Sequence, residues 1–143
     1  MACFSISTPV KTYIMKSIFS SLLAVSLILF SSFAQTSNID EVVAALRSGN
    51  TTEMSKYFDD NLELTLPDKS NSYSKAQATL ILKDFFNNNG VKGFDVKHKG
   101  GQVGDQFCIG TLQTQTGNFR TTVFMKVNGT KEVVKKIRFE AIE

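Results

Sequence analysis

The spacing of apolar residues changes once along the mature part of the chain, and the change separates predicted helices from predicted strands. Before Gly90, two segments repeat apolar residues every three or four positions, which is the spacing of one face of a helix. After Gly90, apolar and polar residues alternate, which is typical of strands with one buried face. The chain is therefore expected to fold as an α+β domain.

The first half of this domain is expected to hold three helices and one strand. In order, these are a helix from about 39 to Gly49, a short helix at 51–58, a half-buried strand at 62–66 and a helix that ends near 87–90. A polar loop at 68–73 separates the strand from the third helix. Ser74 and Gln77 have the spacing of a capping box, which fixes the start of the third helix.

Four strands joined by hairpins are expected in the second half. Asn128-Gly129 is the strongest hairpin signal, because a type I′ turn needs two residues that tolerate positive φ. A meander of long, twisted strands curls. We therefore expect a cone-shaped, curved antiparallel sheet with the three helices packed on its concave face. Six phenylalanines are expected to point inward: Phe58, Phe85, Phe94, Phe107, Phe119 and Phe139.

An apolar run at 18–30 has the pattern of a secretory signal peptide. Lys16 precedes the run and Ser32-Phe33-Ala34 closes it with small residues at −3 and −1. The run is shorter than the roughly 20 apolar residues of a spanning helix, so we expect cleavage after Ala34, with an uncleaved membrane anchor as the alternative. Residues 1–34 are then an upstream extension, starting at Met1 or Met15, plus the signal, and 35–143 are one domain. The protein is expected in the periplasm or outside the cell, without a stable membrane anchor.

Charge and cysteine content argue against nucleic acid as a partner and against a disulfide within the chain. Removing Lys11 and Lys16 from the 16 basic residues leaves 14 against 13 acidic ones, so the mature domain is close to neutral. Such a balance argues against a dedicated nucleic-acid-binding protein. Cys108 is the only cysteine left after cleavage, so we expect no disulfide within the chain and a buried, inert thiol.

The order of elements over Ser37–Glu143 resembles the nuclear-transport-factor-2-like superfamily, which has a cystatin-like curved sheet. The chain is also similar to an exported family known as domain of unknown function 4783. The similar segments are Leu46-Arg47-Ser48-Gly49-Asn50, Tyr73-Ser74-Lys75-Ala76-Gln77-Ala78 with Leu82-Lys83-Asp84-Phe85-Phe86, and Ile137-Arg138-Phe139-Glu140. The superfamily hosts both enzymes and binding modules, so the resemblance implies the fold and leaves the function open.

No constellation for catalysis, metal binding or cofactor binding stands out. His98 is the only histidine, and no cluster with metal-ligand spacing, nucleophile elbow or phosphate-binding loop occurs. The resemblance implies one alternative, a ketosteroid isomerase- or dehydratase-like enzyme that moves a proton inside the cone. Tyr57 and Tyr73 could reach the mouth of the cone, but no acid is evidently paired with them. We therefore expect no catalytic residue, metal or cofactor.

Two interpretations of the interior stay open. The twelve phenylalanines and the absence of tryptophan describe an apolar interior, which is either filled or partly open for a small apolar ligand. An open pocket would be lined by Tyr57, Phe58, Phe85, Phe107 and Phe139. The sequence thus predicts an exported, non-enzymatic domain that binds a small apolar ligand or a protein partner in the cell envelope.

The convex face of the sheet is the expected site of self-association. Phe124 is placed near its centre, with Leu112 and Val134 as apolar neighbours and charged residues around them. An apolar centre inside a polar border suits a two-fold contact between identical chains, and the resemblance implies dimers through this face. The alternative is a monomer with a few exposed apolar side chains.

Overall fold

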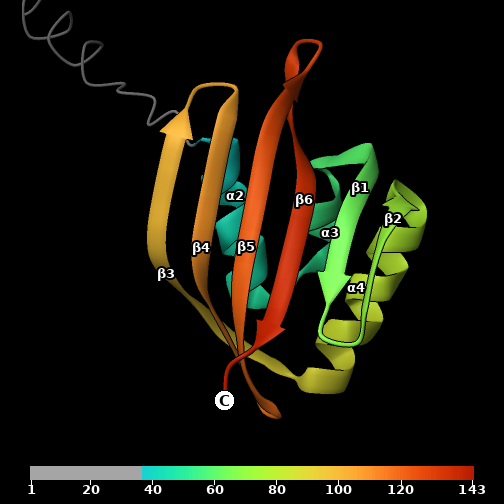
Figure 1. Ribbon diagram of the computed structural model, residues 1–143, viewed down its shortest axis with the longest axis vertical. Helices are drawn as coiled ribbons and strands as arrows, with labels where there is room; N and C mark the ends of the chain where they lie inside the picture. Colours follow the sequence, from blue (N-terminus) through green and yellow to red (C-terminus); the bar gives the residue numbers. More distant parts are fainter. Residues whose placement is uncertain (1–36) are drawn as a thin grey trace, which may run out of the picture. The chain divides into compact units, whose positions relative to one another are not determined.

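Three helices lie in the first half of the region that the computed structural model describes, residues 37–143 (Figure 1). They are α2 (Asn38–Ser48), α3 (Thr51–Ser55) and α4 (Lys75–Asn89). Gly49 ends α2 with a φ of 67°, which favours glycine. The capping box predicted for α4 is present, since Ser74 and Gln77 exchange hydrogen bonds.

Six strands form a single sheet in the order β2-β1-β6-β5-β4-β3. Their bounds are β1 Phe58–Leu66, β2 Lys69–Ser74, β3 Val91–Gln102, β4 Asp105–Thr114, β5 Gly117–Asn128 and β6 Lys131–Ala141. All neighbouring strands are antiparallel except β1 and β6, which run parallel. The predicted α+β class, a curved sheet with three helices in the first half, is confirmed, although the sheet is mixed.

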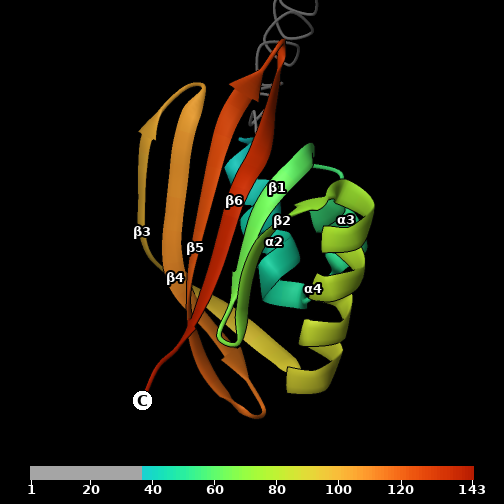
Figure 2. The same ribbon diagram turned by 45° about the vertical axis from the view of Figure 1, so that its right-hand side comes forward.

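All three helices lie on one side of the sheet (Figure 2). Apolar side chains from α2 and α4 meet the inward side chains of the central strands and form one core. The largest fully buried side chains come from both layers: Phe139, Leu46, Met54, Leu62, Leu64, Leu82, Leu112, Met125, Ile137, Val42, Val123 and Val134. Burial of this apolar surface is the main force that holds the two layers together.

Two elements differ from the sequence expectations. Residues 69–74, expected in a polar loop, form the edge strand β2, because their backbone pairs with β1 although their side chains are polar. Phe58, expected at the end of the second helix, instead opens β1, since α3 ends at Ser55. The first difference arises from a hairpin whose returning strand is polar, and the second from long-range pairing of Phe58 with Val134 on β6. Neither is visible in the alternation of apolar and polar residues.

The hairpin between β5 and β6 is also shifted by one residue. Asn128 still pairs with Lys131, so Gly129 and Thr130 make the turn. Gly129 has a φ of 67°, and no non-glycine residue of the described part has a positive φ. The predicted type I′ turn at Asn128-Gly129 is therefore wrong, because that turn needs positive φ at both central residues.

The apolar run at 18–30 and the cleavage site after Ala34 lie outside the described residues. Within residues 37–143, no helix is both long and apolar enough to cross a membrane.

Candidate functional site

Most of the residues expected to line an interior pocket lie in the filled core. Phe139 is fully buried and Phe58 is 3% exposed. Phe85 is half-buried, and its ring centroid lies 5.0 Å from that of Phe139 and 5.2 Å from that of Phe119. Tyr57 is half-buried against the same core. The rings of Phe85, Phe119 and Phe139 pack together between α4 and the sheet.

Phe107 is placed on the wrong face by the sequence pattern. It pairs with Phe124 across β4 and β5, and their ring centroids are 6.3 Å apart on the side away from the helices. β4 carries apolar residues on both faces, so alternation alone does not show which face is inward. Gly110 determines which face of β4 is inward, because the Phe94 ring packs over it. A Cβ at this position would lie 2.5 Å from that ring.

The predicted orientation is wrong for two of the three residues expected on the convex face, again because the pattern along the strand did not show which side is inward. Leu112 and Val134 are fully buried, and only Phe124, 37% exposed, lies on the uncovered face. Leu112 follows the orientation of β4. Val134 points inward because Lys135 is an extra residue between two consecutive pairs with β5, a β-bulge that reverses the alternation.

The side of the sheet that faces away from the helices is here called the outer face (Figure 2). Its aromatic side comprises Phe107 and Ile109 on β4 and His98 on β3, and its charged side comprises Lys136, Arg138 and Glu140 on β6. Arg120, Thr122 and Phe124 of β5 lie between them. The His98 and Phe107 ring centroids are 5.5 Å apart. No other element of residues 37–143 covers this face.

A hollow of about 390 Å³ lies on the charged half of the outer face. Its lining residues are Arg120, Thr122, Phe124, Lys136, Arg138 and Glu140. Three of these side chains are cationic and one is acidic. Lys136 forms an ion pair with Glu63 at 2.7 Å, and Arg138 lies 3.6 Å from Glu140. The hollow is therefore positively charged and has one aromatic wall.

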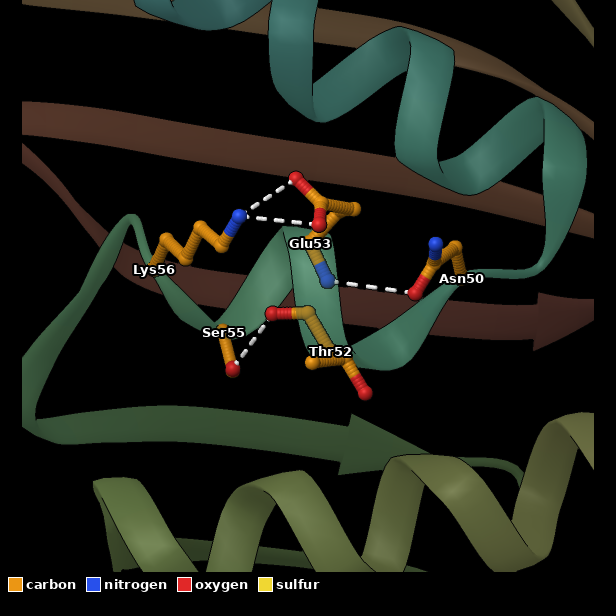
Figure 3. Close-up of polar contacts among 5 residues, drawn as sticks. All are labelled: Asn50, Thr52, Glu53, Ser55 and Lys56. Carbon is orange, nitrogen blue, oxygen red and sulfur yellow. Dashed lines mark hydrogen bonds and ion pairs between the residues drawn. The ribbon is translucent and has the colours of Figure 1, made fainter.

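A second hollow, of about 400 Å³, lies where α2 passes into α3. Polar residues from this junction and from α4 line it: Ser48, Gly49, Asn50, Thr51, Thr52, Lys83 and Asn87. The Asn50 side chain accepts a hydrogen bond from the Glu53 backbone, and Lys56 binds the Glu53 carboxylate at 2.8 Å (Figure 3). These contacts stabilise the two ends of the short helix α3.

Asp59, at the start of β1, carries a buried carboxylate. It is 7% exposed, binds the Lys135 ammonium and accepts a hydrogen bond from the Asn128 amide at 2.7 Å. The Lys135 hydrogen bond, with help from Asn128, lowers the Asp59 pKa, while burial opposes that shift. This cluster joins the start of β1 to the β5–β6 hairpin.

Cys108 is fully buried in the core, and burial raises the pKa of its thiol to about 11. A thiol in such surroundings is a poor nucleophile at neutral pH. Within residues 37–143, no three His, Cys, Asp or Glu side chains are grouped so as to hold a metal ion.

Sequence reasoning missed the part of the outer face that β3 and β4 form. Phe107 was expected to point inward, and no expectation concerned the hollow beside Arg120. The alternation of Arg120, Thr122 and Phe124 with buried neighbours on β5 was the one usable signal, and it placed those three residues correctly.

The comparisons with known proteins agree with this fold. Residues 39–140 match the family described as "Domain of unknown function (DUF4783)". No curated protein matches the chain. A DUF4783 family protein from Bacteroides ovatus is 36% identical, with a TM-score of 0.69, over 72% of this chain and 94% of that one. A second, from Bacteroides uniformis, is 33% identical, with a TM-score of 0.72, over 75% and 99%.

More distant structures share the fold alone. An NTF2-like protein of unknown function from Cytophaga hutchinsonii is 11% identical, with a TM-score of 0.55, over 77% of this chain and 94% of that one. The similarity is to a nuclear-transport-factor-2-like architecture.

Proposed function

Because the chain belongs to the DUF4783 family and has a nuclear-transport-factor-2-like fold, we propose that it is an exported, non-enzymatic binding module that docks a protein partner in the cell envelope through the outer face of its sheet. One contrast carries this proposal. The helix-covered side of the sheet is filled by Phe58, Phe139 and their neighbours, whereas the opposite side presents Phe124, Phe107 and a hollow without any covering element among residues 37–143.

The composition of the outer face supports a protein partner over a small apolar ligand. Aromatic side chains and arginines are enriched at the centres of protein interfaces. Phe107, Phe124, Arg120 and Arg138 supply both types on adjacent strands. A small apolar ligand would need an enclosed apolar cavity, whereas the hollow on this face is open, and Phe124 is the one apolar residue among the six that line it.

A proton-transfer enzyme is the second interpretation of this fold, and the described residues give it little support. Such an enzyme needs a carboxylate able to act as a base beside a proton donor. Asp59 is buried but is engaged by Lys135, which lowers its pKa. Among residues 37–143, no hydrogen bond joins a tyrosine hydroxyl to a carboxylate.

Export forms part of the proposal and rests on the pattern of residues 16–34. The intact mass of the secreted protein is expected to correspond to a chain that begins at Gln35. A chain that begins well before this residue would contradict cleavage, and the uncut chain in the membrane fraction would favour an anchor.

Site-specific photocrosslinking in living cells tests the docking face. A photoreactive phenylalanine analogue at Phe124 is expected to give a crosslinked protein adduct. The matched control carries the analogue at Leu80 of α4, which is 63% exposed and lies on the other side of the molecule. Equal adduct yields at both positions, or no adduct at Phe124, would overturn the proposal.

A further inference from the structure

The charged half of the outer face has more cations than carboxylates. Three cations and one acid line the hollow, so its lining carries a formal charge of +2. Glu63 of β1 forms an ion pair with Lys136. Arg138 lies 3.6 Å from Glu140, and the register places Arg120 across from the same acid. Among residues 37–143, Arg120 forms no ion pair. Two guanidinium groups therefore share a single carboxylate.

These two guanidinium groups lie on either side of a short residue. Thr122 stands between Arg120 and Phe124 along β5, and Arg138 is its register partner on β6. All four side chains line the hollow of about 390 Å³. A guanidinium group presents its N–H donors as a planar fork that matches the two oxygens of a carboxylate. The hollow therefore offers both the space and the donors for an oxyanion.

An apolar strip borders the hollow. Phe124 forms one wall of the hollow, and the register places Phe107 and Ile109 on the next strand, β4. The Phe107 and Phe124 ring centroids are 6.3 Å apart. Strands β4 and β6 are separated by two strand spacings, roughly 10 Å, which about three or four residues of extended chain can span. One short segment can therefore contact both the cations and the aromatic rings.

We propose that the protein partner of the outer face docks through an acidic segment. A carboxylate of this segment enters the hollow between Arg120 and Arg138, and a neighbouring apolar side chain packs on Phe124 and Phe107. Complementary charge supports this assignment, because opposite charges guide the encounter of two proteins and fix their register. This inference rests on the proposed function and names the chemistry of the partner.

A nucleic acid fits the same surface less well. A phosphate backbone is bound by lysine and arginine side chains that neutralise several successive phosphates. Here Glu63 and Glu140 lie among the cations, and the adjoining positions on β4 are apolar. A protein segment with one or two carboxylates beside an apolar side chain matches this surface better.

Photocrosslinking at Phe124 in charge variants tests the acidic segment. Arg120→Glu is expected to lower the adduct yield by about tenfold or more, because the new carboxylate repels the acid of the partner. Arg120→Lys keeps the charge and is expected to retain about half of the yield or more. The matched control is Lys126→Glu, which makes the same charge change on β5, nearer to Phe124 and outside the hollow. It is expected to change the yield by less than about twofold.

A milder change on the opposite wall gives a second variant. Arg138→Gln removes one charge without adding an acid and is expected to lower the adduct yield by about threefold or more. Circular dichroism of the purified variants establishes that each is folded. Arg138→Gln decides the question if Arg120→Glu does not fold.

Mass spectrometry of the adduct identifies the segment itself. The crosslinked peptide is expected to carry Asp or Glu within about four residues of the crosslinked position. A peptide without such an acid, equal yields for Arg120→Glu and Lys126→Glu, or an adduct of two copies of this chain would overturn the acidic segment and leave the docking face in place. The absence of any adduct at Phe124 in the otherwise unmutated protein would overturn the proposed function as well.

Discussion

Asp59 is the residue at which local electrostatics contribute most clearly to this fold. Its carboxylate is buried, and Lys135 and Asn128 supply the hydrogen bonds that compensate for lost hydration. Lys135 is available for this contact because the β-bulge removes it from the regular alternation of β6. The cluster therefore couples the bulge to the parallel pairing of β1 with β6.

Asp59→Asn is expected to lower the free energy of unfolding at pH 7 by about 1–2 kcal/mol, a modest value because Lys135 is 39% exposed. The folded-state pKa lies below the unfolded one. The ionised group therefore contributes stability above the unfolded pKa of about 4, and this stability is lost as the pH falls through the folded pKa. Urea unfolding at a series of pH values measures both effects.

The exposed neighbour provides the control, since Asp60→Asn is expected to change stability by less than about 0.5 kcal/mol. The assignment fails if the difference between the protein and Asp59→Asn is as large at about pH 2 as at pH 7.

Gly110→Ala is expected to destabilise the fold by about 1–3 kcal/mol, because the new methyl group would lie 2.5 Å from both the Asp95 carbonyl oxygen and the Phe94 ring. Gly93→Ala is the matched control on β3, where the nearest atom is the Gln113 side-chain oxygen at 3.3 Å. Thermal unfolding compares the two. Equal melting temperatures would mean that Gly110 does not set the orientation of β4.

At the scale of elements, the helices were predicted better than the strand faces. The stripe from Ile39 to Leu46 and the cap at Ser74 depend on neighbours within one or two turns, so a local pattern contains them. The inward faces of β4 and β6 do not follow from local pattern. β4 is apolar on both sides, and the bulge at Lys135 reverses the alternation of β6 halfway along. Both depend on pairing with other strands.

Ser74→Ala is expected to lower the free energy of unfolding by about 1 kcal/mol, because the Ser74 hydroxyl accepts a hydrogen bond from the Gln77 backbone N–H at the start of α4. Ser72→Ala, at an exposed position of the neighbouring strand β2, is expected to have little effect. Chemical denaturation of both variants measures the difference. Equal losses for the two would show that the capping box does not stabilise α4.

At the scale of the whole molecule, the sheet separates two different surfaces. Its inner side is occupied by helices and by aromatic rings that fill the expected pocket. Its outer side carries the hollow and the exposed Phe124. The sequence identified Phe124 because β5 alternates without interruption, and it missed Phe107 on the same face because β4 is apolar on both sides.

Native mass spectrometry of the protein purified from its own host tests the central claim, that binding uses the outer face and not the interior. The mass is expected to exceed that of one bare chain by the mass of a bound protein, with no additional small molecule, and Phe124→Glu is expected to give one bare chain. A single unmutated chain that retains a small apolar ligand would contradict the account directly.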